Sequence, residues 1–148
     1  MKRMVWPALA AMLAFVPVGC ATQTSQAEDD IPVKIDTAAD ITALLLGKTV
    51  YGRYADGTPW IEFHTKDGVS AYRISQFSCP ARWEVSGNVL CSSTEDFEPT
   101  CFNLWRAGSK VLFVIVGEDP KAKDVLVADR LVEGDPEGLL ADSPACPE

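Results

Sequence analysis

The stretch Trp60-Ile61-Glu62-Phe63-His64-Thr65-Lys66-Asp67-Gly68-Val69-Ser70-Ala71-Tyr72-Arg73-Ile74 decides the fold of this chain. Its first part, residues 60–65, alternates in the manner of a β-strand with one buried face. Asp67-Gly68 is a dipeptide typical of tight hairpin turns, and residues 69–74 return as a second strand. The stretch therefore predicts a β-hairpin, and the residues on both sides of it repeat the pattern.

Short β-forming segments separated by glycine-containing turns continue along most of the chain. Strands are predicted at 49–54, 60–65, 69–74, 82–85, 89–91, 102–106, 111–116 and 125–132. Residues 111–116 are almost wholly apolar, which indicates a strand that is buried on both faces or that closes a barrel. Because such a sheet must bury its apolar positions and its edges, we expect a mainly β fold, an antiparallel meander curled into a small barrel or half-barrel.

One short helix is predicted ahead of these strands, over Ala38–Leu46. Thr37 followed by Asp40 is typical of a helix start, because the threonine side chain caps the first turn and the acid lies near the positive end of the helix dipole. Three apolar side chains share one face of this helix: Ile41, Leu44 and Leu45. We expect the helix to plug or flank the sheet that follows.

The start of the chain has the pattern of an export signal. Basic residues at Met1-Lys2-Arg3 precede an apolar core over 5–18, and Gly19-Cys20 closes it. The segment resembles a bacterial lipoprotein signal, with Pro17 departing from the usual aliphatic residue. Residues 1–19 are therefore predicted to be a signal peptide, 20–36 a tether, and 37–148 a single β domain with an irregular C-terminal tail.

The resemblance to a lipoprotein signal implies that Cys20 is the lipid attachment residue. Several acyl chains would then hold the protein on a membrane, and Ala21 after the cysteine favours the outer membrane, facing the periplasm. The alternative is an ordinary signal peptidase that cuts after Gly19 or Ala21 and releases a soluble periplasmic or secreted protein. No later segment is apolar over enough residues to span a bilayer.

Composition limits the partners. The chain has 148 residues and a formal net charge of −8, and loss of Lys2 and Arg3 with the signal would bring it to −8 − 2 = −10. A surface this acidic excludes nucleic acid as an expected partner, because nothing would neutralise the phosphates. It is equally unsuited to electrostatic binding of anionic lipids. The charge would suit a cationic partner, including a secreted cationic enzyme.

Five cysteines are present, and four remain if Cys20 is lipidated or removed. An even number in an exported protein predicts two disulfides, for which three connectivities exist. We favour Cys91–Cys101, which would close the base of a polar loop between two strands, together with Cys79–Cys146. A zinc site is not expected, because the chain has no Cys-x-x-Cys pair and its one histidine is remote.

Several motifs follow one another in a recognisable order. They are Leu46-Gly47-x-Thr49-x-x-Gly52, Asp56-Gly57-x-x-Trp60, Asp67-Gly68, Trp83-x-Val85, Leu90-Cys91 and a later Cys101. This order resembles a group of small exported alphaproteobacterial proteins of unknown function. The chain departs from their pattern at Ala81, where a glycine closer to the tryptophan is usual, and at Glu62-Phe63-His64 in place of a tyrosine-rich strand. The resemblance implies a small β domain with a Cys91–Cys101 bridge.

Chemistry-bearing residues are sparse. His64 is the only histidine, and alternation places it on one strand face with Trp60 and Glu62, which together form a possible ligand face. No nucleophile signature accompanies the histidine, so we interpret it as a strand residue on a polar or partly exposed face. The acidic loop Glu95-Asp96-x-Glu98 lacks the spacing of a calcium loop and is expected to be a solvated turn. No metal and no cofactor is predicted.

The sequence favours a non-enzymatic envelope lipoprotein that binds a small ligand or a protein. Many aromatic residues lie in predicted strands, where they form either the core of a small β domain or the wall of a ligand cavity. Two other classes stay open. One is a soluble periplasmic hydrolase with His64 as its base, and the other is a purely structural envelope protein.

Overall fold

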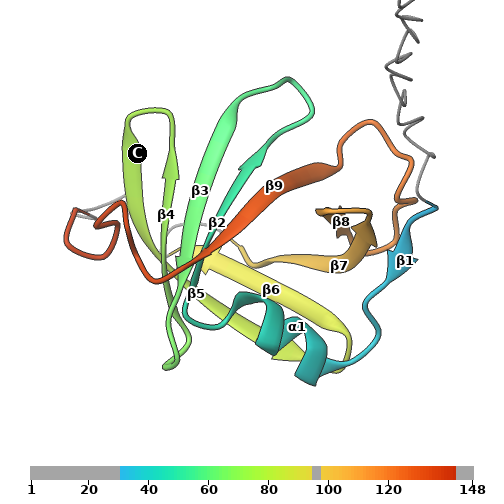
Figure 1. The fold of residues 1–148 in the computed structure, drawn as a ribbon, viewed down its shortest axis with the longest axis horizontal. Helices are drawn as coiled ribbons and strands as arrows, with labels where there is room; N and C mark the ends of the chain where they lie inside the picture. Colours follow the sequence, from blue (N-terminus) through green and yellow to red (C-terminus); the bar gives the residue numbers. More distant parts are fainter. Residues whose placement is uncertain (1–30, 95–97, 143–148) are drawn as a thin grey trace, which may run out of the picture.

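The computed structural model describes residues 31–94 and 98–142, and within them the chain forms a barrel of antiparallel strands with one short helix (Figure 1). Residues 1–30, which include the predicted signal and Cys20, lie outside the described part. The elements in order are β1 (Val33–Lys34), α1 (Ala38–Leu45), β2 (Lys48–Arg53), β3 (Pro59–His64), β4 (Val69–Ile74), β5 (Phe77–Ser86), β6 (Val89–Thr94), β7 (Thr100–Ala107), β8 (Lys110–Ile115) and β9 (Leu126–Glu133).

The strands from β2 to β9 form a closed up-and-down barrel. Each pairs with the next along the chain, and β9 pairs back with β2, where Thr49 lies opposite Val132. All eight predicted strands are confirmed, and the curled meander is a complete barrel. The predicted hairpin turns are confirmed as well, since Gly57 and Gly68 adopt φ of 87° and 78°, a conformation that glycine adopts without strain.

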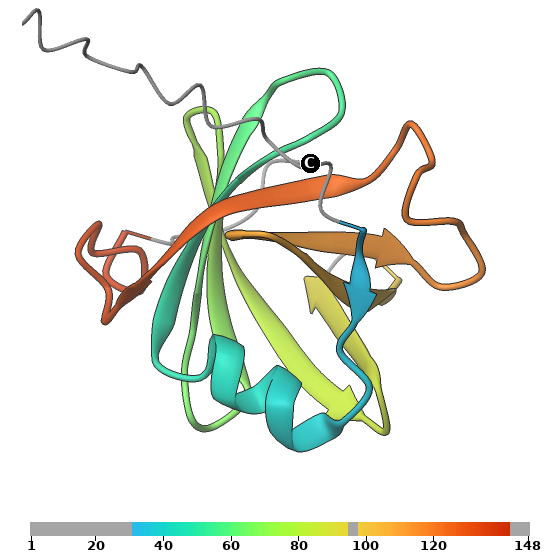
Figure 2. The ribbon, with the colours of Figure 1, turned by 45° about the vertical axis from the view of Figure 1, so that its right-hand side comes forward.

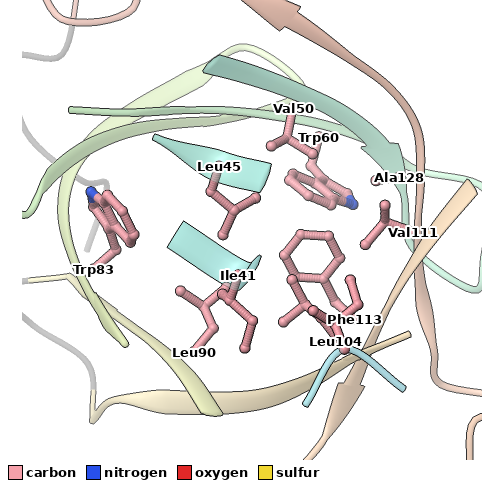
Figure 3. Packing of buried hydrophobic residues seen from close by; sticks show 11 residues of the cluster. Ile41, Leu45, Val50, Trp60, Trp83, Leu90, Leu104, Val111, Phe113 and Ala128 are labelled. Carbon is pink, nitrogen blue, oxygen red and sulfur yellow. The ribbon is translucent and has the colours of Figure 1, made fainter. Parts of the chain in front are cut away.

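The helix α1 closes one end of the barrel (Figure 2). The Thr37 side chain accepts a hydrogen bond from the Asp40 backbone N–H, as the predicted cap requires. Ile41 and Leu45 are fully buried and project between the strands (Figure 3). The helix ends one residue earlier than predicted, and Leu46 is its C-terminal cap.

A short strand that the sequence did not predict precedes the helix. Val33 and Lys34 form β1 and pair with Arg106 and Trp105 of β7. The next residue, Ile35, is buried in the main core and donates its backbone N–H to the Leu104 carbonyl. Residues that were assigned to the tether, which was expected to run to residue 36, therefore belong to the barrel.

The main core fills the barrel between α1 and the middle of the strands. Its buried members come from the helix and from most strands: Ile35, Ile41, Leu45, Val50, Trp60, Trp83, Leu90, Leu104, Val111, Phe113 and Ala128. Strand β8 is buried on both faces, as predicted, because Val111 and Phe113 face this core whereas Leu112 and Val114 join a second cluster with Val125.

The segment after β9 has no helix or strand up to residue 142, as predicted, yet it is tightly attached. Thr49 Oγ1 donates to the Gly134 carbonyl, and the Asp135 carboxylate accepts from the backbone N–H of Leu139 and of Leu140. The side chain of Leu139 is fully buried. This segment is therefore held against the barrel by hydrogen bonds and by one apolar side chain.

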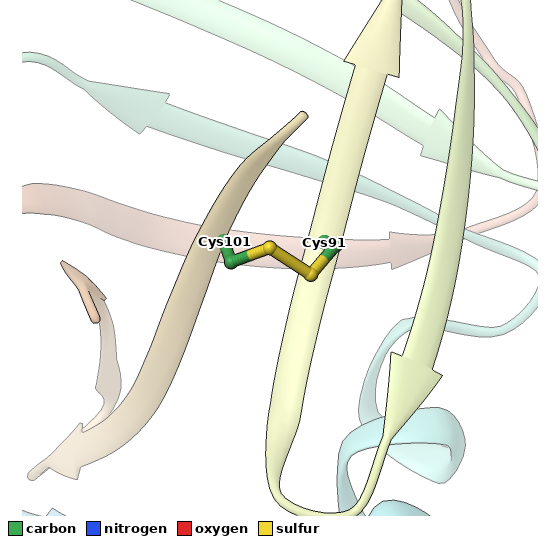
Figure 4. Close-up of a disulfide and its surroundings, with 2 residues drawn as sticks. All are labelled: Cys91 and Cys101. Carbon is green, nitrogen blue, oxygen red and sulfur yellow. A yellow bond between two sulfur atoms is a disulfide. The ribbon is translucent and has the colours of Figure 1, made fainter. Parts of the chain in front are cut away.

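A disulfide joins Cys91 of β6 to Cys101 of β7, which confirms one predicted pair (Figure 4). The two cysteines lie directly opposite each other in the ladder between these strands, which contains only three residue pairs. The disulfide therefore fastens a short ladder of the barrel wall. The predicted partner of Cys79, Cys146, lies outside the described residues, so that pairing stays a prediction.

Within residues 31–94 and 98–142, no helix has the length and hydropathy that crossing a bilayer requires.

Candidate ligand-binding site

A cavity of about 310 Å³ occupies the barrel at the end away from α1. Much of the lining lies at the ends of β6 and β8, at the starts of β3, β7 and β9, and at Tyr54 just after β2, whereas α1 connects directly to the start of β2. The exposed residues among them, Glu98, Thr100 and Ile115, mark the mouth of the cavity. The end of the barrel beside α1 is thus filled by core side chains, whereas the opposite end contains the cavity.

The walls of the cavity are mainly apolar. The apolar side chains that line it are Trp60, Ala81, Leu90, Phe102, Phe113, Ile115 and Leu126. Trp60 and Phe102 both pack edge to face against Phe113, with ring centroids 5.5 and 6.0 Å apart. These aromatic contacts join β3, β7 and β8, so the wall is a packed part of the barrel.

Glu62 brings a carboxylate to this apolar wall. Its residue exposure is 7%, and its Oε1 accepts hydrogen bonds from Ser70 Oγ at 2.8 Å and from Ser92 Oγ at 3.3 Å. The other oxygen, Oε2, lies 3.7 Å from Nε2 of His64. Glu62 and Ser92 both line the cavity. A carboxylate with neutral hydroxyl donors therefore lies on the wall of an apolar space.

His64 lies behind the carboxylate and does not line the cavity. Its side chain is fully buried and packs edge to face against Trp83, with ring centroids 5.2 Å apart. The interpretation of His64 as a strand residue on a polar or partly exposed face was wrong about exposure, because the side chain is buried inside the barrel against Trp83. Burial lowers the pKa of His64, while the Glu62 carboxylate and the Lys48 backbone act in the opposite direction.

Two tyrosines complete the polar part of the wall. The hydroxyl group of Tyr54, just after β2, and that of Tyr72 in β4 form a hydrogen bond with each other. Burial raises the pKa of both phenols, and the negative charge of Glu62 raises them further, so both hydroxyl groups are neutral at physiological pH. The hydroxyl pair therefore lies within the electrostatic reach of Glu62.

The charged groups that line the cavity all carry the same sign. Glu62 lies on the wall and Glu98 at the mouth, and the described lining contains no lysine, arginine or histidine. The cavity therefore offers negative charge, hydroxyl groups and aromatic surface.

The structure brings the predicted ligand face together on the inside of the barrel, with Trp60, Glu62 and His64 all buried. Trp60 and Glu62 line the cavity, whereas His64 does not, and its Nε2 lies 3.7 Å from the Glu62 carboxylate. Sequence reasoning named the aromatic residues only as a general set that forms either core or cavity wall, so it did not single out Tyr54, Tyr72, Phe102 and Phe113, and it did not consider Ser92. Alternation within a strand can show which residues face the barrel interior. Only the register between strands shows which of these residues are neighbours around the cavity.

The predicted acidic loop falls partly outside the described residues, because Glu95 and Asp96 are not among them. Glu98 is described and lies at the mouth of the cavity. Among the described residues, no group of three or more His, Cys, Asp or Glu side chains is arranged to hold a metal ion.

Comparison of the chain with protein-family models, with curated proteins and with solved structures gives no match.

Proposed function

We propose that this protein is a non-enzymatic envelope lipoprotein whose barrel binds a small, largely apolar ligand. The observation that carries the proposal is the cavity of about 310 Å³ at the open end of the barrel. Its volume lies at the lower limit of the usual range for ligand sites, and its apolar walls with a few convergent polar groups have the composition of such sites. An ordinary core would fill this space with side chains.

The envelope location rests on the sequence. Gly19-Cys20 and the basic, apolar segment ahead of it support lipid attachment at Cys20, which would place the barrel at a membrane surface. The alternative is a soluble periplasmic or secreted protein with the same barrel. Intact mass of the protein from its native membrane fraction tests this part, because an acylated Cys20 adds the mass of its acyl chains.

The hydrolase alternative needs His64 as a general base. A general base must come within hydrogen-bond reach of the proton that it removes. His64 is fully buried and separated from the cavity by the wall that Glu62 forms, so a ligand in the cavity does not reach it. This placement supports binding without catalysis.

Two adjacent residues of β8 and its following turn provide a matched test. Ile115 lines the cavity and is 37% exposed, whereas Val116 is 48% exposed and does not line it. Both side chains are exposed at the surface. We expect Ile115→Trp to narrow the mouth and weaken binding about tenfold or more, and Val116→Trp to leave binding within about twofold.

The probe is N-phenyl-1-naphthylamine, a neutral aromatic dye whose fluorescence rises in apolar surroundings. Saturable binding by the wild-type protein and its selective loss in Ile115→Trp support the proposal. Absence of saturable binding, or equal loss in both variants, overturns it. Circular dichroism on all three proteins tests whether each variant keeps the barrel.

A further inference from the structure

We propose that the ligand class of this cavity is an apolar amine, whose protonated nitrogen pairs with the Glu62 carboxylate. This inference rests on the function proposed above, because it assigns the chemistry of the ligand that the cavity takes. It depends on three observations: the surroundings of Glu62, the sign of the charges around the cavity, and the aromatic wall.

The first observation is that Glu62 has neutral donors and lacks a cationic partner in the described structure. Its Oε1 accepts from the hydroxyl groups of Ser70 and Ser92, and Oε2 lies 3.7 Å from an imidazole that burial keeps neutral. A buried carboxylate is costly unless a positive charge or strong donors compensate it. Two hydroxyl groups compensate it only in part, so the site has capacity for a further donor that carries charge.

The second observation is that the cavity repels anions. Its described charged groups are Glu62 on the wall and Glu98 at the mouth, and both are acids. A fatty acid or another apolar carboxylate would bring a negative charge into this apolar space without a positive partner. An ammonium group meets the opposite situation, because the low dielectric of the cavity strengthens its attraction to Glu62.

The third observation is the aromatic wall beside the carboxylate. Trp60, two residues before Glu62 on the same face of β3, packs with Phe113, and Phe102 extends this surface. Such rings bind the apolar body of a ligand, and their faces also attract a cation. The combination of aromatic rings and one buried carboxylate fits a molecule with an apolar body and one protonated amine.

Two probes of the same size separate charge from shape. One is 1-naphthylmethylamine, whose amine carries a positive charge at the assay pH of about 7.5. The other is 1-naphthylmethanol, which has a neutral hydroxyl group in place of the amine. We expect the amine to bind wild-type protein about tenfold or more tightly than the alcohol, as measured by isothermal titration calorimetry, because a charge-assisted hydrogen bond is stronger than a neutral one.

The variant Glu62→Gln keeps the shape of the side chain and removes its charge. We expect the preference for the amine to disappear in this variant while the alcohol binds within about twofold of its wild-type affinity. Glu84→Gln is the matched control, since it removes the same charge from an exposed position on β5 that does not line the cavity. There the preference should persist, because solvent screens an exposed carboxylate.

The outcomes separate this inference from the proposal on which it rests. If neither naphthalene probe nor N-phenyl-1-naphthylamine binds, the cavity is not a ligand site and both proposals fail. If the alcohol binds as tightly as the amine and Ile115→Trp weakens both, the cavity is a ligand site but the amine class is wrong. The comparison in wild-type protein stands without any variant, so an unfolded Glu62→Gln protein does not remove the test.

Discussion

Gly52 lies directly against the indole of Trp60, on the neighbouring strand. The two residues are paired in the register of β2 and β3, and a Cβ atom at position 52 would lie 2.5 Å from Cε2 of the indole. The backbone of Gly52 is not in the left-handed region, so packing rather than backbone conformation excludes a side chain here. The ladder between β2 and β9 also shifts its register between Tyr51 and Gly52.

We therefore expect Gly52→Ala to displace Trp60 and to lower the free energy of unfolding by about 1–3 kcal/mol, the usual cost of an overpacked core. Urea denaturation followed by tryptophan fluorescence measures this change. In a Trp60→Leu background, which has space at this point, the same substitution should cost less. An equal cost in both backgrounds would show that the indole is not the obstacle.

The Cys91–Cys101 disulfide should stabilise the barrel by lowering the conformational entropy of the unfolded chain. The two cysteines are ten residues apart in sequence, and a loop of this length corresponds to about 3 kcal/mol in the chain-entropy model. We expect the double variant Cys91→Ser/Cys101→Ser to lose about this free energy of unfolding. Chemical reduction is a poorer test because it acts on every disulfide of the chain. A double variant as stable as the wild type would show that the ladder closes without the disulfide.

His64 should make the protein less stable in acid. Burial lowers its pKa in the folded state, so between that lowered value and the unfolded value of about 6.5 the unfolded chain binds more protons. Stability from this group is complete above about pH 6.5 and declines as the pH falls below it, by at most about 1.4 kcal/mol per pH unit. Chemical denaturation at a series of pH values measures this slope.

The variant His64→Phe keeps a ring beside Trp83 and removes the titrating group. Its unfolding free energy should therefore vary less with pH below 6.5 than that of the wild type. Identical slopes in the two proteins would assign the acid sensitivity to other groups.

Two consecutive leucines after β9 allow a controlled test of the C-terminal segment. Leu139 is 0% exposed and Leu140 is 47% exposed, although Asp135 accepts a hydrogen bond from the backbone of both. We expect Leu139→Ala to cost about 2–5 kcal/mol, because it leaves a cavity. Leu140→Ala should change the free energy of unfolding by no more than about 0.5 kcal/mol. Thermal denaturation of the two variants provides the comparison, and similar losses would contradict the anchoring role of Leu139.

Local patterns were sufficient to predict most of the barrel. Alternation and turn dipeptides gave all eight strands from β2 to β9, and the cap at Thr37 gave the helix. Two features escaped because they depend on contacts distant in sequence. Val33–Lys34 is too short to have a pattern and becomes a strand only by pairing with β7. The start of β5 at Phe77 was missed because Pro80, which lacks a backbone N–H, argues locally against a strand.

The candidate site was predicted only in part, for a related reason. Alternation correctly places Trp60, Glu62 and His64 on one face, since this depends on a single strand. Whether each of these residues lies beside the cavity or beside the helix depends on its position along the barrel axis. Trp60 and Glu62 line the cavity at the open end, whereas the His64 carbonyl accepts a hydrogen bond from the N–H of Gly47, just after α1. The position of each residue along the barrel axis depends on the register between strands that are distant in sequence. A local sequence pattern does not contain this information.

The pairing of β2 with β9 also governs how the chain reaches its native state. Thr49 and Gly134, which are joined by a hydrogen bond, are 85 residues apart in sequence, so the barrel closes only when nearly all of its strands are available. Contacts of such high order make folding slow, typically milliseconds to seconds. A polypeptide stopped before β9 would leave β2 and β8 as open edges that attract other strands. Completion of the last strand is therefore the step that converts an association-prone sheet into a self-contained molecule.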